Sequence, residues 1–347
     1  MDDYYYRYLG SCSDGKTKQR AYHLIRQGLT ELNTSFSVPK LSSDELSEVF
    51  TFVSLDHPEI FYAPSFTYSF FSQADSVEFT PKYLFRKKEI TEHQKAIASR
   101  IKKVTSPAKE LDAVAKEQYV HDFICRNVHY DKLKKAYSHE IIGPLTQGVG
   151  VCEGIAKTVK VLCDELNILC MIAFCRNNPD KGIKYRHAWN IVNINGKYRH
   201  LDATFDNTLS AGGDIRYDYF NTDDASLFRD HEQLVWPMPP CSDRSEYYYI
   251  RKKLSFTKYD DIRNRVSQAA KKSKPIVFHW RGGYLTQNVL KDLCAIIEEE
   301  ASKKDLSAVI SLNWPQAVFR VSFENSGQKA PESTISMEIS NEGETDN

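Results

Sequence analysis

Three residue types that together could activate a nucleophile occur in order in the middle of the chain. Cys152 follows a glycine-punctuated stretch, residues 148–150, His187 comes 35 residues later, and Asp202 lies another 15 residues along. In a cysteine nucleophile the thiolate attacks, an imidazole takes and returns the proton, and a carboxylate orients the imidazole. The residue types and their order therefore indicate covalent chemistry by a thiol.

A helix that begins at the cysteine is the first element needed to position this chemistry. Apolar residues after Cys152 fall at offsets that trace one helical face. They are Ile155, Ala156, Val159, Leu162, Cys163 and Leu166. The N–H groups and the dipole at a helix N-terminus lower a thiol pKa, and the preceding glycines allow a tight turn that leaves the sulfur accessible. For an isolated cysteine, a small buried hydrophobe at a helix start would be the commoner interpretation.

A β-hairpin is the second element. The dipeptide Asn195-Gly196 lies between two strand-like runs, which is a strong signal for a two-residue turn. Ile194 then faces Lys197, so cross-strand partners have residue numbers that sum to 391. The turn therefore fixes a definite pairing register for the two strands.

This register predicts where the imidazole and the carboxylate lie. His187 is opposite Thr204, and Asp202 is opposite Trp189. Because side chains alternate along a strand, all four project from one face, and His187 and Asp202 are diagonal neighbours about 7–8 Å apart at the backbone. The carboxylate would then accept a hydrogen bond from the ring. Asp206 is the second-ranked candidate for the same role.

The motifs around these residues resemble the transglutaminase-like superfamily of papain-related cysteine enzymes. They read G-V-C-E-G at Cys152, H-A-W-N at His187 and L-D-A-T-F-D at Asp202, and the resemblance covers roughly residues 90–245. The flanking D-H-P-E-I-F-Y and Y-D-Y-F-N stretches are similar to those of bacterial members. The resemblance implies that Cys152 is the nucleophile, that His187 is the general base and acid, and that Asp202 orients it.

Acyl transfer also needs hydrogen-bond donors for the oxyanion. The backbone N–H of Cys152 is one candidate. Gln147 is another, because papain-like enzymes carry a glutamine near that offset, although a plain loop glutamine is an equal interpretation. Trp189 is expected to pack beside the imidazole and limit water, with a core aromatic residue as the alternative.

Other cysteines and histidines could suggest a metal site. The gaps between Cys163, Cys170 and Cys175 lack the close pairs that structural zinc sites show, so we interpret them as core thiols. His121, His129 and His139 precede the nucleophile and are expected to cap or face solvent, or to line the site. We expect no metal and no cofactor, since no acidic loop matches a calcium-binding pattern.

Bulk properties exclude several classes of protein. The 347 residues carry 46 basic and 46 acidic side chains, so no global field favours nucleic acid or a membrane surface. No apolar run approaches the ~20 residues of a membrane span, and the N-terminus lacks a signal-peptide pattern. We therefore expect a cytoplasmic protein with free thiols among its eight cysteines.

The predicted fold is α+β, with a papain-like transglutaminase core in which the nucleophile helix packs on an antiparallel sheet. Small flanking α/β units are expected on both sides. The predicted division is an N-terminal α+β region at 1–89, a catalytic core at 90–245, a C-terminal α/β region at 246–323 and a disordered tail at 324–347.

The predicted function is cysteine-dependent acyl transfer on amide bonds, through a thioester that passes to an amine or to water. A cysteine protease or peptide amidase is the first alternative, and a non-catalytic scaffold or binding protein that keeps the fold is the second. The expected partner is a protein or peptide substrate, with no nucleic acid and no membrane. The residues leave the substrate and the oligomeric state open.

Overall fold

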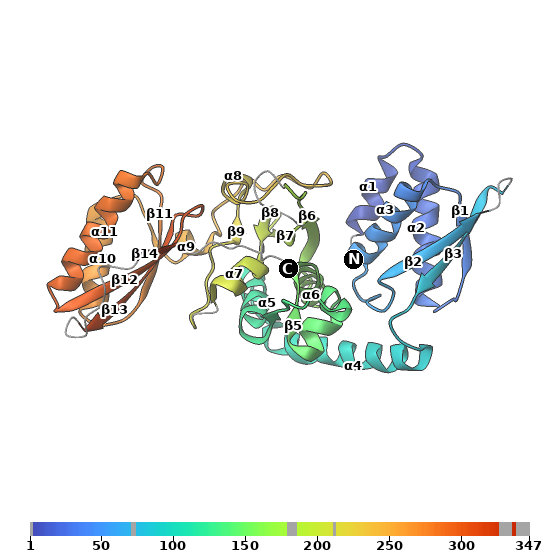
Figure 1. The fold of residues 1–347 in the computed structure, drawn as a ribbon, viewed down its shortest axis with the longest axis horizontal. Helices are drawn as coiled ribbons and strands as arrows, with labels where there is room; N and C mark the ends of the chain where they lie inside the picture. Colours follow the sequence, from blue (N-terminus) through green and yellow to red (C-terminus); the bar gives the residue numbers. More distant parts are fainter. Residues whose placement is uncertain (1–2, 71–73, 179–185, 211–212, 326–334, 338–347) are drawn as a thin grey trace.

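The computed structural model describes residues 3–70, 74–178, 186–210, 213–325 and 335–337. Its elements form three units that follow one another along the long axis (Figure 1). We call them the N-terminal unit (α1 to β3), the central unit (α4 to α8) and the C-terminal unit (α9 to β14). The mixed α+β class predicted from the sequence is confirmed.

The N-terminal unit packs three helices beside a small antiparallel sheet in the order β1-β3-β2. Its elements are α1 (Tyr4–Gly10), α2 (Gly15–Thr30), β1 (Phe36–Pro39), α3 (Ser43–Asp56), β2 (Ser65–Phe70) and β3 (Ser76–Lys82). Helix α3 begins at a capping box in which Ser42 accepts from the Glu45 N–H and Glu45 accepts from the Ser42 N–H. This is the helix start that the Ser-Ser-Asp-Glu sequence predicts.

The central unit holds a four-stranded antiparallel sheet in the order β6-β7-β8-β9, covered by helices. Its larger elements are α4 (Lys87–Thr105), α5 (Ala113–Asn127), α6 (Cys152–Glu165), β6 (Leu169–Phe174), β7 (Ala188–Ile194), β8 (Lys197–Leu201), α7 (Ala203–Leu209), β9 (Phe220–Thr222) and α8 (Asp224–Leu227). Helix α6 packs against β6 and β7, with α4, α5 and α7 beside it. The predicted arrangement of a helix on an antiparallel sheet is therefore present.

The lysine cluster and glycines of residues 132–150 predict a loop, but the structure has short ordered elements there. They are η2 (Ala136–His139), η3 (Gly143–Gln147) and β5 (Val149–Gly150), and β4 (His129–Tyr130) comes just before them; η1 (Ser106–Ala108) lies between α4 and α5. Strands β4 and β5 pair in parallel, so the stretch before Cys152 is tied to the end of α5. Such two-residue strands have too little periodicity to be recognised in a sequence.

The hairpin register predicted from Asn195-Gly196 is confirmed. Ile194 pairs with Lys197, and the ladder continues in that register to Asn190 and Leu201. Asn195 and Gly196 have φ values of 54° and 80°, which are the left-handed conformations that a type I′ turn requires at both positions.

The C-terminal unit is a five-stranded mixed sheet in the order β10-β11-β13-β12-β14, with α10 and α11 along one face (Figure 1). Its elements are α9 (Tyr248–Arg251), β10 (Ser255–Phe256), α10 (Tyr259–Ala270), β11 (Ile276–Trp280), α11 (Gln287–Ser302), β12 (Leu306–Asn313), β13 (Val318–Asn325) and β14 (Ile335–Met337). The sequence pattern predicts a strand near 276–280, a helix at about 285–303 and a strand near 317–323, and these correspond to β11, α11 and most of β13. It does not predict α10 or β12.

The expectation of a disordered tail from Glu324 is wrong for two short stretches. Glu324 and Asn325 complete β13, and Ile335–Met337 pair in parallel with β12, because this edge of the sheet offers backbone partners that composition does not reveal. The remainder of the tail, 326–334 and 338–347, lies outside the described residues.

Buried apolar side chains connect the first two units and separate the third. One cluster runs continuously from Tyr5 in α1 to Phe220 in β9, whereas the C-terminal unit packs around a cluster of its own that includes Phe278 and Phe319. The N-terminal unit is therefore a packed extension of the central one. The C-terminal unit has its own core, and it reaches the central unit through polar contacts and through Tyr248 of α9, whose ring stacks on that of Tyr217.

Candidate active site

Cys152 is the first residue of α6, as the glycine turn and the helical spacing predict. Gly148 has a φ of 67°, and a Cβ added at Gly150 would lie 2.7 Å from Pro144 Cγ. A Cβ at Gly154 would overlap the carbonyl oxygen of Ser138. Two of these glycines thus allow the close packing that fixes the start of the helix, while Gly148 supplies a backbone conformation that L-residues rarely adopt.

The Cys152 side chain is partly exposed, in contrast to the cysteines of the core. Cys163, Cys170 and Cys175 are free thiols with buried side chains, which agrees with their interpretation as core residues. The hydrogen bond with Cys170, the largest cause, and burial hold the pKa of Cys163 well above its usual value. Cys152, at the end of a helix and open to solvent, has the placement that a reactive thiol needs.

Strand β7 is held directly against the N-terminal half of α6. The Asn190 side-chain amide donates to the Ala156 carbonyl at 3.0 Å. Ala156 lies four residues after Cys152 and so shares its helical face. His187 immediately precedes β7, and its carbonyl accepts from the Cys175 N–H at 3.0 Å. These contacts anchor the start of β7 beside the helix that carries the thiol.

The imidazole and the first-ranked carboxylate meet as predicted, but by a different local route. His187 Nε2 lies 2.6 Å from Asp202 Oδ2. The expected strand pairing of His187 with Thr204 and of Asp202 with Trp189 is wrong, because the ladder ends at Leu201. Asp202 instead caps α7, where its Oδ1 accepts the N–H groups of Thr204 and Phe205 at 2.9 and 3.0 Å. The capping bonds turn the chain out of the strand.

Asp202 is fully buried and nevertheless stays ionised. Burial alone would raise its pKa, but the charge of His187 and the hydrogen bonds from His187 and His231 outweigh it and hold the Asp202 pKa well below its usual value. A carboxylate can only accept hydrogen bonds, so His187 donates through Nε2. Nδ1 is then the ring nitrogen that would exchange a proton with a thiol.

Trp189 stacks on the His187 ring, with centroids 5.9 Å apart and planes at 18°. Its indole N–H donates to His200 Nδ1 at 3.0 Å, and His200 Nε2 donates to Asp224 Oδ1 at 2.8 Å. Burial, the largest cause, lowers the pKa of His200, which keeps its ring neutral and able to accept from the indole. Trp189 is thus fixed beside the imidazole, where it was expected.

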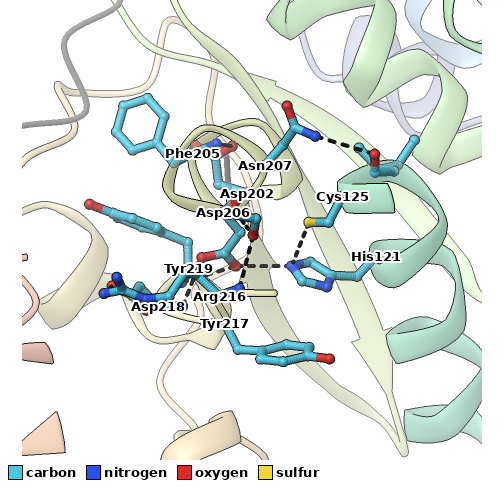
Figure 2. Close-up of polar contacts among 12 residues, drawn as sticks. His121, Cys125, Asp202, Phe205, Asp206, Asn207, Arg216, Tyr217, Asp218 and Tyr219 are labelled. Carbon is cyan, nitrogen blue, oxygen red and sulfur yellow. Dashed lines mark hydrogen bonds and ion pairs between the residues drawn. The ribbon is translucent and has the colours of Figure 1, made fainter. Parts of the chain in front are cut away.

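Asp206, the second-ranked orienter, belongs to a different cluster (Figure 2). Its carboxylate lies 3.1 Å from His121 Nε2 and accepts the backbone N–H groups of Asp218 and Tyr219. Burial raises the pKa of Asp206 to about 7. The side chain faces α5 and not His187, so the structure favours Asp202 as the partner of His187.

Gln147 receives little support as an oxyanion donor. Its side chain is exposed at the end of η3, and its amide donates to the neighbouring Thr146 hydroxyl at 3.4 Å. Cys152 occupies the helix position whose N–H points out of the helix end, so its own backbone remains the better candidate.

A buried ionic cluster that sequence reasoning missed braces the first turn of α6. Lys157 Nζ lies 2.8 Å from Glu140 and 2.9 Å from Glu153, the residue after the cysteine. His139 lies 3.5 Å from Glu153, so one of the three histidines considered from the sequence joins this cluster. Burial raises the pKa of Glu140 to about 7, whereas Lys157 and His139 overcome burial and lower that of Glu153 to about 2.

His231 is the second feature that sequence reasoning missed. Its Nε2 lies 2.9 Å from Asp202 Oδ2, the oxygen that also accepts from His187. The residue sits in a loop after α8, where no periodic pattern predicts its direction, and its only sequence signal is the pair of acidic neighbours in Asp230-His231-Glu232.

Two groups in the described residues have the donor types of a metal site. They are His187 with Asp202 and His231, and His200 with Asp224 and Cys241. In the second group His200 Nδ1 accepts from Trp189, so coordination through Nε2 would leave the ring without a proton. In the first group His187 and His231 each donate a hydrogen bond to Asp202. Hydrogen bonds among the side chains are therefore enough to explain why the residues of each group lie close together.

An antiparallel sheet, a helix that starts at a partly exposed cysteine and a buried histidine–aspartate pair therefore occur together in the central unit. Residues 95–203 match the model of the transglutaminase-like superfamily, which confirms the resemblance drawn from the sequence motifs. The match includes Cys152, His187 and Asp202 and stops short of the C-terminal unit. No curated protein matches the chain.

Two solved structures are similar over part of the chain. The crystal structure of a TGase is 12% identical, covers 41% of this chain and 44% of its own, and has a TM-score of 0.29. The crystal structure of a candidate cysteine protease from Cytophaga hutchinsonii is 15% identical, covers 40% of this chain and 61% of its own, and has a TM-score of 0.26. Each match spans less than two thirds of the solved chain. Among the described residues of the present protein, no helix is long and apolar enough to cross a membrane.

Proposed function

We propose that the protein catalyses acyl transfer on amide bonds through a thioester at Cys152. The observation that carries this proposal is the buried His187–Asp202 hydrogen bond of 2.6 Å beside the helix that begins at the partly exposed Cys152. The superfamily match over the same residues supports it. A protein or peptide is the proposed acyl donor.

In the proposed reaction His187 Nδ1 takes the thiol proton, and the Cys152 sulfur attacks the amide carbonyl carbon. The C–N bond then breaks, and His187 returns the proton to the leaving amine. An amine or a water molecule attacks the resulting thioester and regenerates the thiol. Asp202 keeps Nε2 protonated throughout, so that Nδ1 remains the basic nitrogen.

A peptide amide library, including side-chain amides, tests the proposal with and without a labelled primary amine. Wild type is expected to release product and to show a covalent acyl adduct on Cys152 by intact mass spectrometry. Cys152→Ala is expected to abolish both. Cys125→Ala, which removes another partly exposed cysteine, is the matched control and should behave as wild type. Activity retained in Cys152→Ala would refute the proposal.

The same assay separates the transferase from a protease or peptide amidase. Labelled amine in the product supports transfer, and hydrolysis that millimolar amine leaves unchanged supports the hydrolase. A non-catalytic scaffold is tested without any substrate, by treating the protein with limiting iodoacetamide at about pH 6. Alkylation of Cys152 ahead of the other seven cysteines supports an enzyme, whereas uniform labelling would support the scaffold.

A further inference from the structure

The catalytic carboxylate of the proposed function is shared by two imidazoles. Asp202 Oδ2 accepts from His187 Nε2 at 2.6 Å and from His231 Nε2 at 2.9 Å. Its other oxygen accepts the two backbone N–H groups at the start of α7. All of the carboxylate's positions for hydrogen bonds are therefore used, and His231 is the second side chain that holds Oδ2 in place.

His231 is itself held by a second carboxylate. Its Nδ1 lies 2.9 Å from Asp230 Oδ1, so each ring nitrogen faces a carboxylate oxygen and donates to it. Burial alone would lower the pKa of His231, but the hydrogen bonds to Asp202 and Asp230 outweigh it and raise that pKa. His231 is thus favoured as an imidazolium.

The charges in this cluster balance in a way that suits the thiol chemistry. The His231 cation offsets the charge of Asp230, which leaves the single negative charge of Asp202 to stabilise a protonated His187. Aromatic rings surround the buried His231 side chain and shield it from water. The His231 ring lies 4.7 Å from that of Phe205 and 5.1 Å from that of Trp189.

The C-terminal unit reaches this cluster directly. Gln316, between β12 and β13, is buried, and its amide Nε2 lies 3.2 Å from both oxygens of Asp230 and 3.1 Å from the Ser226 carbonyl. The Tyr219 hydroxyl donates to Asp230 Oδ2 at 2.6 Å. Asn313, at the end of β12, adds hydrogen bonds to Asp218 and Tyr219. The superfamily match ends at residue 203, before each of these residues.

We infer that His231 is a positioning residue for the catalytic carboxylate, and that Asp230 and Gln316 make the C-terminal unit a structural part of the active site. The inference rests on the proposed function, and it assigns to the C-terminal unit a role in orienting Asp202. If the C-terminal unit only packed against the central one, its contacts would not have to include the buried hydrogen bond from the Gln316 amide to Asp230, the carboxylate that holds His231.

Variants at His231 test the contact with Asp202 apart from its effect on folding. His231→Phe keeps the ring and removes both hydrogen bonds. His231→Gln places an amide nitrogen near the original Nε2 and can still donate to Asp202, whereas His231→Asn can reach only Asp230. We expect His231→Phe and His231→Asn to lower kcat/KM about 10- to 100-fold, chiefly through kcat, and His231→Gln to recover much of the loss.

The pH profile of Cys152 alkylation gives a readout that a purely structural role would not move. The charged and titratable groups that face His231 are His187, Asp202 and Asp230, with Tyr219 and His200 nearby. With His231→Phe the orientation of Asp202 is lost, so the alkylation rate at about pH 6 is expected to fall relative to that at about pH 9. Gln316→Met, which keeps the side-chain length and removes the amide donor, should shift the profile in the same direction by a smaller amount.

His121→Phe is the matched control, because it removes another buried histidine–aspartate hydrogen bond, to Asp206 instead of Asp202. It is expected to lower Tm in the manner of His231→Phe while keeping the wild-type alkylation profile and kcat within a few-fold. Equal behaviour of the two variants, or no rescue by His231→Gln, would overturn the inference. If wild-type Cys152 is neither selectively alkylated nor acylated, the proposed function itself fails, so the two failures are distinguishable.

Discussion

Replacing Asp202 with asparagine separates its charge from its place in the fold. The amide oxygen of the Asp202→Asn variant would still accept the Thr204 and Phe205 N–H groups, because asparagine caps helices as well as aspartate does. In the wild type the N–H groups of His187 and His231 donate to Oδ2 at 2.6 and 2.9 Å. In the variant an NH₂ group would replace Oδ2, so neither imidazole N–H would have an acceptor there.

His187 can relieve this conflict only by moving its proton to Nδ1. The ring nitrogen that should accept the thiol proton would then already carry one. The same substitution in a Ser-His-Asp triad lowers kcat about 10,000-fold, which corresponds to ~5.5 kcal/mol of activation free energy. We expect a loss of that size in acylation of Cys152, with a folded protein.

Single-turnover acylation, followed by intact mass spectrometry, measures the effect, and circular dichroism checks the fold. Asp206→Asn is the matched control, since Asp206 is an equally buried carboxylate one helical turn away that bonds His121. Its activity should stay within a few-fold of wild type. A folded Asp202→Asn that acylates within about tenfold of wild type, together with an inactive Asp206→Asn, would show that the wrong carboxylate has been assigned.

Three further substitutions test how the scaffold supports the site. Lys157→Met leaves the buried Glu140 and the partly exposed Glu153 without their cation and should lower the free energy of unfolding by about 3–5 kcal/mol in urea titrations. Lys303→Met should change it little, because the side chain of this C-cap residue of α11 is half exposed and Arg263 still pairs with Glu299 and Glu300; equal effects would contradict the role of burial. Gly154→Ala should displace the first turn of α6 from Ser138 and slow Cys152 alkylation, while Gly10→Ala, whose added Cβ meets only the end of the flexible Gln19 side chain, should not. Glu117→Gln should raise Tm more at pH 8 than at pH 5. Burial raises the pKa of Glu117 in the folded state to about 8, whereas the unfolded chain releases this proton above about pH 4.5. The wild type therefore loses stability as the pH rises from about 4.5 to about 8. A Tm gain in Glu117→Gln that is the same at both pH values would argue against this titration.

Much of the central unit could be predicted because its signals are local. The spacing after Cys152 identified α6, and the Asn195-Gly196 turn identified the register of β7 and β8. The prediction went wrong where a capping bond competed with strand pairing, at Asp202 and Thr204. Asp202 still reached His187, because both residues flank the same end of the hairpin.

The sequence by itself determined the helix that begins at Cys152, the hairpin register and the proximity of His187 to Asp202. The helix follows from apolar spacing, and the other two follow from the Asn195-Gly196 turn, which brings the two ends of the hairpin together. Only the tertiary structure decided which groups surround that pair. His231 arrives from a loop 29 residues after Asp202, and Gln316 arrives from another unit. Burial and these hydrogen bonds together then set the pKa of each group, and both are properties of the folded chain and not of residue spacing.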